Sequence, residues 1–393
     1  MYDVIVVGGR CAGAATALLL ARRGHRILLL ERARFPSDTL STLYIHQPGV
    51  DRLARWRVLD EVRATGCPPL ERISFRAPGL LLTGPAPAWG AATGGLAPRR
   101  YALDTILARA AARAGADFRD GCSVTGLLWE GDTVAGVRYT TPGGGTDQAR
   151  ARLVVGADGR NSTVARLVGA PYLRHDGRLT VALYTYWSGL SGDGLGLYSG
   201  PGAGAALVPT QDGLTLVNVQ LPRDTPVTRG NARHAYLAGA LRACPDLAEL
   251  LAAGRQEERL FRCTDLPNFF RRAYGSGWVL VGDAGHHKDP CGAHGISDAL
   301  AQAELLAGCL AETVGDPSLR EKALRQYAEE RDRRWTPPYE SNLAYARLSP
   351  TENHLEVLRK GETDPLFRSL VFRALAGIPD EDLRSLGRQA EVH

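Results

Sequence analysis

The hexapeptide GGRCAG joins a short apolar run to a stretch of small residues and leucines. The run Tyr2–Val7 predicts a buried parallel strand, and residues 11–24 predict a helix that ends at Gly24. A glycine turn at such a junction aims the first helical amides at the end of the strand, where they can bind an anionic pyrophosphate. The spacing predicts a dinucleotide site formed by Gly8, Gly9, Arg10, Cys11, Ala12 and Gly13.

A second apolar run, residues 27–30, completes a βαβ unit and is followed by Glu31 and Arg32. An acid at this point can accept the hydroxyls of an adenosine ribose. Arg10 stands where the fingerprint has its central glycine, so an ordinary βαβ unit with a glycine turn remains the alternative. If the site is real, we expect the Arg10 side chain to run outward toward the phosphates or the pocket mouth, or else to be merely solvated.

Two further stretches each predict a loop between a strand and a helix. In GADGRNSTVARL, a strand over residues 153–155 is followed by a turn at 156–159 and a helix from Ser162. In WVLVGDAGHHKDPCGAHGIS, a strand at 278–281 is followed by Gly282-Asp283, a proline-glycine loop and a long helix from about Ile296. Between the fingerprint and these motifs, Arg100 opens an amphipathic helix, four residues before Asp104.

With these motifs in this order, residues 1 to about 330 resemble the class A flavin monooxygenase superfamily, which has the fold of p-hydroxybenzoate hydroxylase. The resemblance implies that the chain binds FAD. It implies that Asp158 belongs to the DG motif, that Asp283 of the GD motif binds the ribityl chain, and that Arg100 lies near the adenosine diphosphate. By the same resemblance Val124 contacts adenine, and Pro290, Gly292, Gly295 and Ile296 place backbone and a helix N-terminus against the isoalloxazine.

The fold class that follows is α/β: a Rossmann-like FAD-binding domain with an inserted antiparallel-sheet substrate domain and a helical C-terminal segment. We expect residues 1–65, 99–170 and 270–330 to form the first domain, residues 66–98 and 171–269 the second, and residues 331–393 the C-terminal segment. Residues 66–98 predict a hairpin or flap, and residues 172–222 predict consecutive strands. The C-terminal helix should be interrupted at Pro337-Pro338 and again at Pro350.

In this superfamily the antiparallel sheet forms the floor of the substrate pocket, which makes Tyr184, Tyr186 and Trp187 candidate lining residues. Aromatic residues packed in an ordinary sheet face are the alternative for each. His46 and His294 are further lining candidates, and a histidine near the flavin could act as an acid or base. The cluster His286, His287, His294 and Asp289 could suggest metal ligands, but the flavin motif already accounts for that loop, and we expect no metal.

The resemblance implies a monooxygenase: NAD(P)H reduces FAD, oxygen forms a flavin C4a-hydroperoxide, and a small, aromatic or polyketide-like substrate takes one oxygen atom. The alternative is a reductase of the geranylgeranyl reductase type without oxygen insertion. RARFPSDTLST and Asp289-Pro290 are similar to segments of that branch, although Ser37 and Thr39 replace basic residues.

Three other classes fit the sequence less well. A flavin-dependent halogenase is excluded because no lysine precedes Lys288 and no WxWxIP stretch occurs. A disulfide reductase is excluded by the lack of a CxxxxC motif, and the intact motifs argue against a binding protein whose flavin is not catalytic.

Composition bounds the remaining possibilities. The 393 residues are 44% hydrophobic with a net charge of +5, which is globular and calls for one large composite domain or two. The charges are dispersed, so we expect no nucleic-acid partner. Seven cysteines without a CxxC pair indicate reduced thiols in a cytoplasmic protein, and no apolar stretch is long enough for an integral membrane segment. The remaining expected partners are substrate, oxygen and at most a second copy in a homodimer.

Overall fold

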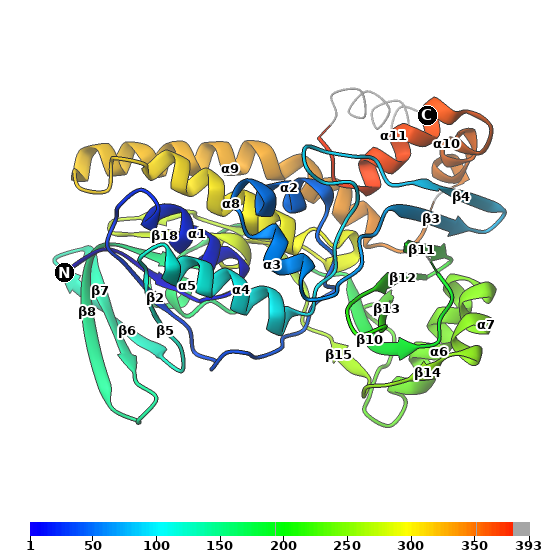
Figure 1. The fold of residues 1–393 in the computed structure, drawn as a ribbon, viewed down its shortest axis with the longest axis horizontal. Coiled ribbons are helices and arrows are strands. Elements are labelled where there is room, and N and C mark those ends of the chain that lie inside the picture. The colour runs from blue at the N-terminus through cyan, green and yellow to red at the C-terminus, as the bar shows by residue number, and fades with distance from the viewer. Residues whose placement is uncertain (193, 351, 380–393) are drawn as a thin grey trace.

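The computed structural model describes residues 1–192, 194–350 and 352–379. Two large sheets lie toward opposite ends of the molecule, and two long helices run between them (Figure 1). The first sheet has the order β17-β18-β8-β1-β2-β5. Its strands are β17 (Tyr274–Gly275), β18 (Trp278–Leu280), β8 (Thr146–Gly156), β1 (Tyr2–Val7), β2 (Ile27–Leu30) and β5 (Asp117–Arg119). β1 pairs in parallel with β2 and β8, as expected for strands joined by crossover helices.

Both faces of this first sheet are covered, which explains why its central strands are continuous apolar runs. One face packs against helices α1 (Cys11–Ala21), α4 (Arg100–Arg113) and α8 (Gly295–Leu310). The strands β6 (Ser123–Glu130) and β7 (Thr133–Thr140) continue this sheet, because β7 pairs antiparallel with β8, and together with the short helix α5 (Thr163–Leu167) they cover its other face. Val4 and Val6 face the helices, whereas Ile5 and Val7 face the β6–β7 side.

The second sheet has the order β14-β10-β13-β12-β11-β3-β4, with β15 also paired to β10. Its strands are β14 (Arg255–Gln256), β10 (Thr180–Ser188), β13 (Thr215–Pro222), β12 (Ala203–Pro209), β11 (Leu195–Gly200), β3 (Arg72–Ala77), β4 (Leu80–Pro85) and β15 (Phe261–Cys263). Helices α6 (Ala232–Ala243) and α7 (Pro245–Ala253) pack on one face. Helices α10 (Glu352–Thr363) and α11 (Pro365–Leu375) contribute side chains to the cluster on the other face.

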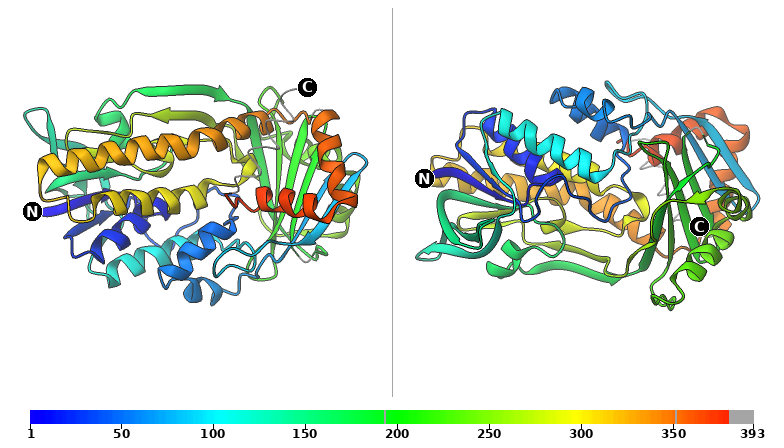
Figure 2. Two further views of the ribbon diagram at one scale, coloured as in Figure 1. Left: turned by 90° about the horizontal axis from the view of Figure 1, so that it is seen from above. Right: turned by 60° about the horizontal axis from the view of Figure 1, so that its bottom comes forward.

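The segment 66–98 therefore contains a β-hairpin, β3–β4, and this hairpin joins the second sheet through β11. The consecutive strands expected within residues 172–222 are also confirmed, as β9 to β13. A small third sheet consists of β19 (His286–His287), β16 (Pro267–Arg271) and β9 (Tyr172–Arg178). In the views of Figure 2, the longest strand of this third sheet, β9, runs between the two ends of the molecule.

Four further elements are short: α2 (Gln47–Arg55), α3 (Leu59–Arg63) and the 3-10 turns η1 (Gly282–Ala284) and η2 (Pro290–Gly292). The last two turns lie within the GD motif. They hold the loop between β18 and α8 in place.

The expected interruption at Pro337-Pro338 is wrong. Helix α9 (Pro317–Tyr345) begins earlier than residue 331 and continues through both prolines. A proline removes an amide donor and leaves the carbonyl four residues earlier without its helical partner. Those carbonyls belong to Arg333 and Arg334, which are exposed and can bond water, while buried Trp335 and Tyr339 hold the helix on either side.

The helix does end before Pro350, and residues 380–393 of the expected C-terminal segment lie outside the described residues. Among the described helices, none is both long enough and apolar enough to cross a membrane.

Candidate functional site: a dinucleotide cradle joined to an aromatic wall

The fingerprint glycines are required by close packing between β1, α1 and the GD motif. A Cβ on Gly13 would lie 1.8 Å from the carbonyl oxygen of Gly8, so only glycine lets the helix start this close to the strand. Gly282 has a φ of +61°, and a Cβ there would lie 2.9 Å from the Cβ of Ala12. The fingerprint and the GD motif, about 270 residues apart in sequence, therefore meet at the N-terminus of α1.

Arg10 fits the fingerprint because its position does not need glycine. Its φ of −87° is open to any residue, and it serves as the residue before α1. The guanidinium contacts the carboxylate of Asp104 at 2.6 Å and the side chain and carbonyl oxygen of Ser37 at 3.0 and 3.3 Å. In this structure the cation thus ties α1 to α4 and to the loop after β2. Its contact with a cofactor or substrate stays a prediction.

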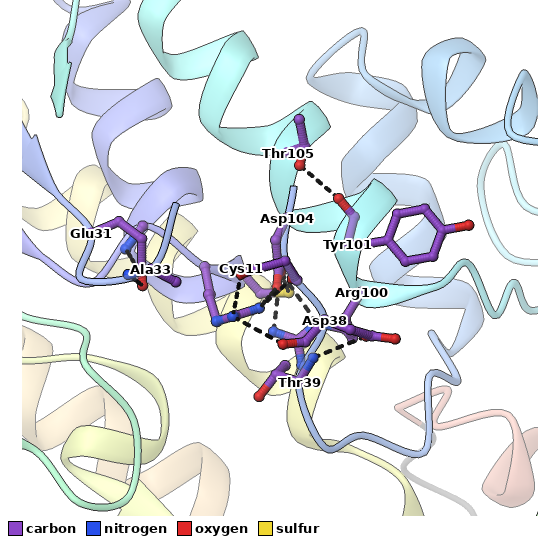
Figure 3. A network of polar contacts seen from close by, with 12 residues as sticks. Cys11, Glu31, Ala33, Asp38, Thr39, Arg100, Tyr101, Asp104 and Thr105 are labelled. Carbon is purple, nitrogen blue, oxygen red and sulfur yellow. Dashed lines mark hydrogen bonds and ion pairs between the residues drawn. The ribbon is translucent and has the colours of Figure 1, made fainter. Parts of the chain in front are cut away.

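Asp104 is a fully buried carboxylate shared by two arginines and a thiol. Besides Arg10 it accepts from Arg100 Nη2 at 3.0 Å and from Cys11 Sγ at 3.2 Å. Figure 3 shows Asp104 close to Cys11 and Arg100, with Asp38 nearby. Burial opposes the charge of Arg100, but the charge and hydrogen bond of Asp104, together with the nearby Cys11 and Asp283, raise the pKa of Arg100. The i,i+4 spacing of Arg100 and Asp104 was the sequence signal for this pair.

Glu31 lies at the end of β2, where the sequence placed it, and is buried. Its carboxylate accepts from the amide of Gly9 at 2.7 Å and from the amide of Ala33 at 2.9 Å, the second of which is visible in Figure 3. The acid therefore holds the fingerprint turn, and its contact with a ribose stays a prediction. Arg32, next along the chain, is exposed.

The two acids of the later motifs have different surroundings. Asp158 caps α5: its carboxylate accepts from the hydroxyl of Ser162 and from the amides of Thr163 and Val164. Burial nevertheless raises the pKa of Asp158 against these bonds. Asp283, in η1, is half-buried and close enough to Arg100 for its charge to help raise the pKa of that arginine. Val124, in β6, is partly buried against the second core of the first sheet.

His46 and His294 lie together at the N-terminus of α8. Their rings stack with centroids 4.3 Å apart and an interplanar angle of 11°. His46 Nε2 lies 3.1 Å from the carbonyl oxygen of Gly292, and its backbone amide donates to Ser297 in the first turn of α8. Burial lowers the pKa of His46 to about 4 and places the pKa of His294 well below its ordinary value. Both rings are therefore neutral at physiological pH.

The three aromatic candidates of β10 lie on opposite faces of the strand, because alternate side chains on a strand point to opposite faces. Which of them line a substrate pocket stays a prediction. Tyr184 and Tyr186 belong to a buried cluster with Tyr44 that Ala293, of the loop before α8, packs against. Trp187 points the other way, donating its indole N–H to Tyr236 of α6 at 3.0 Å. Two of the three candidates from β10 thus share a wall with the GD loop.

Arg99, which the sequence reading did not single out, links this wall to the loop after β2. Its guanidinium lies 3.9 Å from the ring centroid of Tyr186 and pairs with Asp38 and Glu258, each at 2.7 Å. Asp38 follows Ser37, which Arg10 holds. The only signal in the sequence was the Arg99-Arg100 pair at the start of α4.

The histidines of the GD motif do not converge on one point. His286 contacts Gln302 at 3.2 Å, and His287 contacts the carbonyl of Pro267. His294 stacks on His46 instead. Over the described residues, no group of three or more His, Cys, Asp or Glu side chains is arranged to hold a metal ion.

These residues fit FAD. The glycine cradle leaves room beside the α1 N-terminus for a pyrophosphate, and Glu31 and Arg100 stand where an adenosine diphosphate needs an acceptor and a cation. Asp283 is a half-buried carboxylate suited to the hydroxyls of a polyol, and the N-terminus of α8 can stabilise negative charge on a flavin.

Comparison with known proteins agrees with this arrangement. The model of the family described as "FAD binding domain" matches residues 1–337. The 6-methylpretetramide 4-monooxygenase of Streptomyces rimosus is 30% identical over 348 residues, which is 84% of this chain and 80% of the relative. Digeranylgeranylglycerophospholipid reductase 1 of Methanococcoides burtonii is 26% identical over 355 residues, 87% of this chain and 81% of the relative.

Solved structures confirm the expected fold class. A flavin-dependent brominase superposes with a TM-score of 0.81 at 19% identity, covering 96% of this chain and 93% of the other. A geranylgeranyl bacteriochlorophyll reductase-like protein from Thermoplasma acidophilum superposes with a TM-score of 0.73 at 19% identity, covering 92% and 90%. At these identities the likeness shows the fold alone. From the motif geometry and the family match together, the chain belongs to the FAD-binding domain family and is an FAD-dependent oxidoreductase.

Proposed function

We propose that this protein is an NAD(P)H-using monooxygenase that acts on a small aromatic or polyketide-like substrate. The observation that carries the proposal is the buried cluster that joins Tyr44, Tyr184 and Tyr186 and is contacted by Ala293 of the GD loop. An apolar, water-excluding wall beside the flavin motif suits oxygen transfer to an uncharged organic molecule. Bound FAD, once reduced by NAD(P)H, supplies the oxygen-activating chemistry.

The residues of this chain bind and orient. Burial raises the pKa of both Tyr184 and Tyr186, so each remains a neutral phenol that can donate a hydrogen bond to a substrate oxygen. Arg99 is already paired with Asp38 and Glu258 and so offers no unpaired cation to an anionic substrate. The wall therefore favours a neutral, flat substrate over a carboxylate.

The similarity to 6-methylpretetramide 4-monooxygenase supports oxygen insertion into an organic substrate. A rifampicin monooxygenase of Streptomyces venezuelae, 32% identical over 188 residues, supports the same reaction type for nearly half of the chain.

A reductase without oxygen insertion is the second candidate. It is favoured by the similarity to digeranylgeranylglycerophospholipid reductases and by Asp289-Pro290 in the GD loop. Such an enzyme would deliver hydride to a carbon–carbon double bond, and its apolar wall would hold an isoprenoid chain.

The test measures what the FAD-loaded protein consumes. Aromatic polyketides and geranylgeranyl lipids are screened for those that accelerate NAD(P)H oxidation, and oxygen uptake and product mass are then followed. A monooxygenase consumes one O₂ and one NAD(P)H for each product heavier by one oxygen atom. Turnover of a geranylgeranyl lipid under anaerobic conditions, with saturation of a double bond, would overturn the proposal in favour of the reductase.

A further inference from the structure

Asp289, the residue before Pro290 in the GD loop, is a buried carboxylate held entirely by neutral donors. It is 1% exposed. Its Oδ2 accepts from Thr180 Oγ1 at 2.6 Å, and its Oδ1 accepts from Gln220 Nε2 at 3.3 Å and from the amide of Cys291 at 3.2 Å. The neighbouring cation, Lys288, pairs with Asp298 instead, at 2.9 Å.

The backbone of Asp289 is fixed as tightly as its side chain. Its amide donates to Asn268 Oδ1 at 2.7 Å, and its carbonyl accepts from Asn342 Nδ2 at 3.0 Å. Asn268 lies in β16 and Asn342 in α9, and both are buried. Five hydrogen bonds from four elements and the loop itself thus converge on one residue, which makes it the fixed point of the loop that leads into α8.

The two side chains that hold the carboxylate belong to the same sheet face as the aromatic wall. Thr180 lies four and six residues before Tyr184 and Tyr186 on β10, so all three point the same way. Gln220, on the neighbouring strand β13, lies opposite Ala182 and therefore between the levels of Thr180 and Tyr184 on the same face of the sheet. One face of the second sheet therefore carries the substrate wall at one end and the anchor of the GD loop at the other.

Burying a carboxylate without a cation costs free energy that an amide or an alanine would avoid. A neutral side chain at position 289 would be sufficient if its only role were to attach the loop to β10 and β13 by hydrogen bonds. Burial indeed raises the pKa of Asp289, and the bond from Thr180 works against that rise.

We propose that Asp289 is a positioning residue through which the substrate sheet fixes the GD loop, residues 289–295, against the flavin. The inference rests on the FAD chemistry proposed above and extends it to the strand that carries the aromatic wall, which holds the loop through the bond from Thr180 to Asp289. With FAD bound, the Asp289 carboxylate would add negative charge near the group that accepts an electron pair and would lower the midpoint potential of the flavin.

The test uses a set of variants whose controls come from the same strand. Thr180→Val removes one bond to the carboxylate, Asp289→Ala removes them all, and Asp289→Asn keeps the shape and removes the charge. Thr185→Val is the matched control, because Thr185 is also fully buried on β10 and makes one hydrogen bond, to the carbonyl of Glu258 at 2.7 Å, on the opposite face.

Two measurements are made. Amide hydrogen exchange of residues 289–295 in the apoprotein should be about tenfold faster in Thr180→Val and Asp289→Ala and unchanged in Thr185→Val. In the FAD-loaded protein, the midpoint potential of the flavin should rise in Asp289→Asn. Amide exchange in the Asp289→Asn apoprotein should stay near the wild-type rate, because the side-chain amide oxygen can still accept hydrogen bonds from Gln220 and Cys291.

The inference is overturned if Thr180→Val and Thr185→Val exchange alike, or if Asp289→Asn leaves the midpoint potential unchanged. Should Asp289→Ala fail to fold, Thr180→Val and Asp289→Asn still decide both points. Failure of the proposed function looks different: a wild-type protein that binds FAD but inserts no oxygen leaves both measurements intact.

Discussion

Arg10 shows how a single residue can depart from a fingerprint without destroying it. The backbone at this position does not need glycine, and the long side chain leaves the turn to pair with buried Asp104 and to hold Ser37. The cation thus ties the loop after β2 to the nucleotide-binding helices. The cradle itself is made by Gly8 and Gly13, which Arg10 does not touch.

We therefore expect Arg10→Gly to keep its FAD while substrate or cofactor affinity falls severalfold. Asp104 keeps Arg100 as a partner, so the loss of the charged hydrogen bond from Arg10 to Asp104, together with the bonds from Arg10 to Ser37 and Asp38, should lower the free energy of unfolding by about 1.5–3 kcal/mol. The flavin-to-protein absorbance ratio, FAD titration and KM measure these effects. Arg10→Lys, which keeps the charge, is the control, and total loss of flavin in Arg10→Gly would contradict this account.

At the scale of elements, the C-terminal helices belong to the core of the second sheet. Phe372 of α11 is 3% exposed, and a Cβ on Gly84 of β4 would lie 2.8 Å from its ring. Leu358 of α10 joins the same cluster as Tyr184 and Tyr186. α11 therefore closes one side of the aromatic wall through packing rather than through charge.

Phe372→Ala should lower the free energy of unfolding by about 3–5 kcal/mol, because it opens a cavity between β4 and α11. Chemical denaturation measures this change. Leu366→Ala on the same helix is the control: Leu366 is 73% exposed, and its loss should cost less than about 0.5 kcal/mol. Equal effects of the two substitutions would mean that α11 does not pack on the sheet as described.

At the scale of the whole molecule, buried histidines make folding depend on pH. Burial lowers the pKa of His46 to about 4 and of His286 and His294 well below the ordinary value. The unfolded chain protonates these rings near pH 6.5 whereas the folded chain keeps them neutral, so the unfolded state binds more protons as the pH falls. These three histidines therefore make the folded state more stable at pH 7 than at pH 5.

Protonation of His46 in the unfolded chain alone should lower the free energy of unfolding by about 2 kcal/mol when the pH falls from 8 to 5. Denaturant titrations at both pH values measure the difference. His46→Asn should reduce this difference by that amount. A pH dependence that His46→Asn does not alter would refute the prediction.

The sequence by itself determined the parts of this protein that depend on local chemistry. Apolar runs and glycine spacing identified β1, α1 and β2, and three motifs in order identified an FAD protein. These features can be predicted from the sequence because a buried parallel strand, a tight turn and a helix start each depend on a few adjacent residues. The hairpin β3–β4 and the strands of the second sheet were legible for the same reason.

Only the tertiary structure decided which distant residues act together. Arg10 meets Asp104 across 94 residues, and Thr180 meets Asp289 across 109, and no periodicity predicts either pair. The face on which Trp187 lies depends on the register of β10, and the passage of α9 through two prolines depends on Trp335 and Tyr339 packing on either side. Contacts of this kind form when the sheets and helices are brought together, so their energies are not carried by any one segment of the chain.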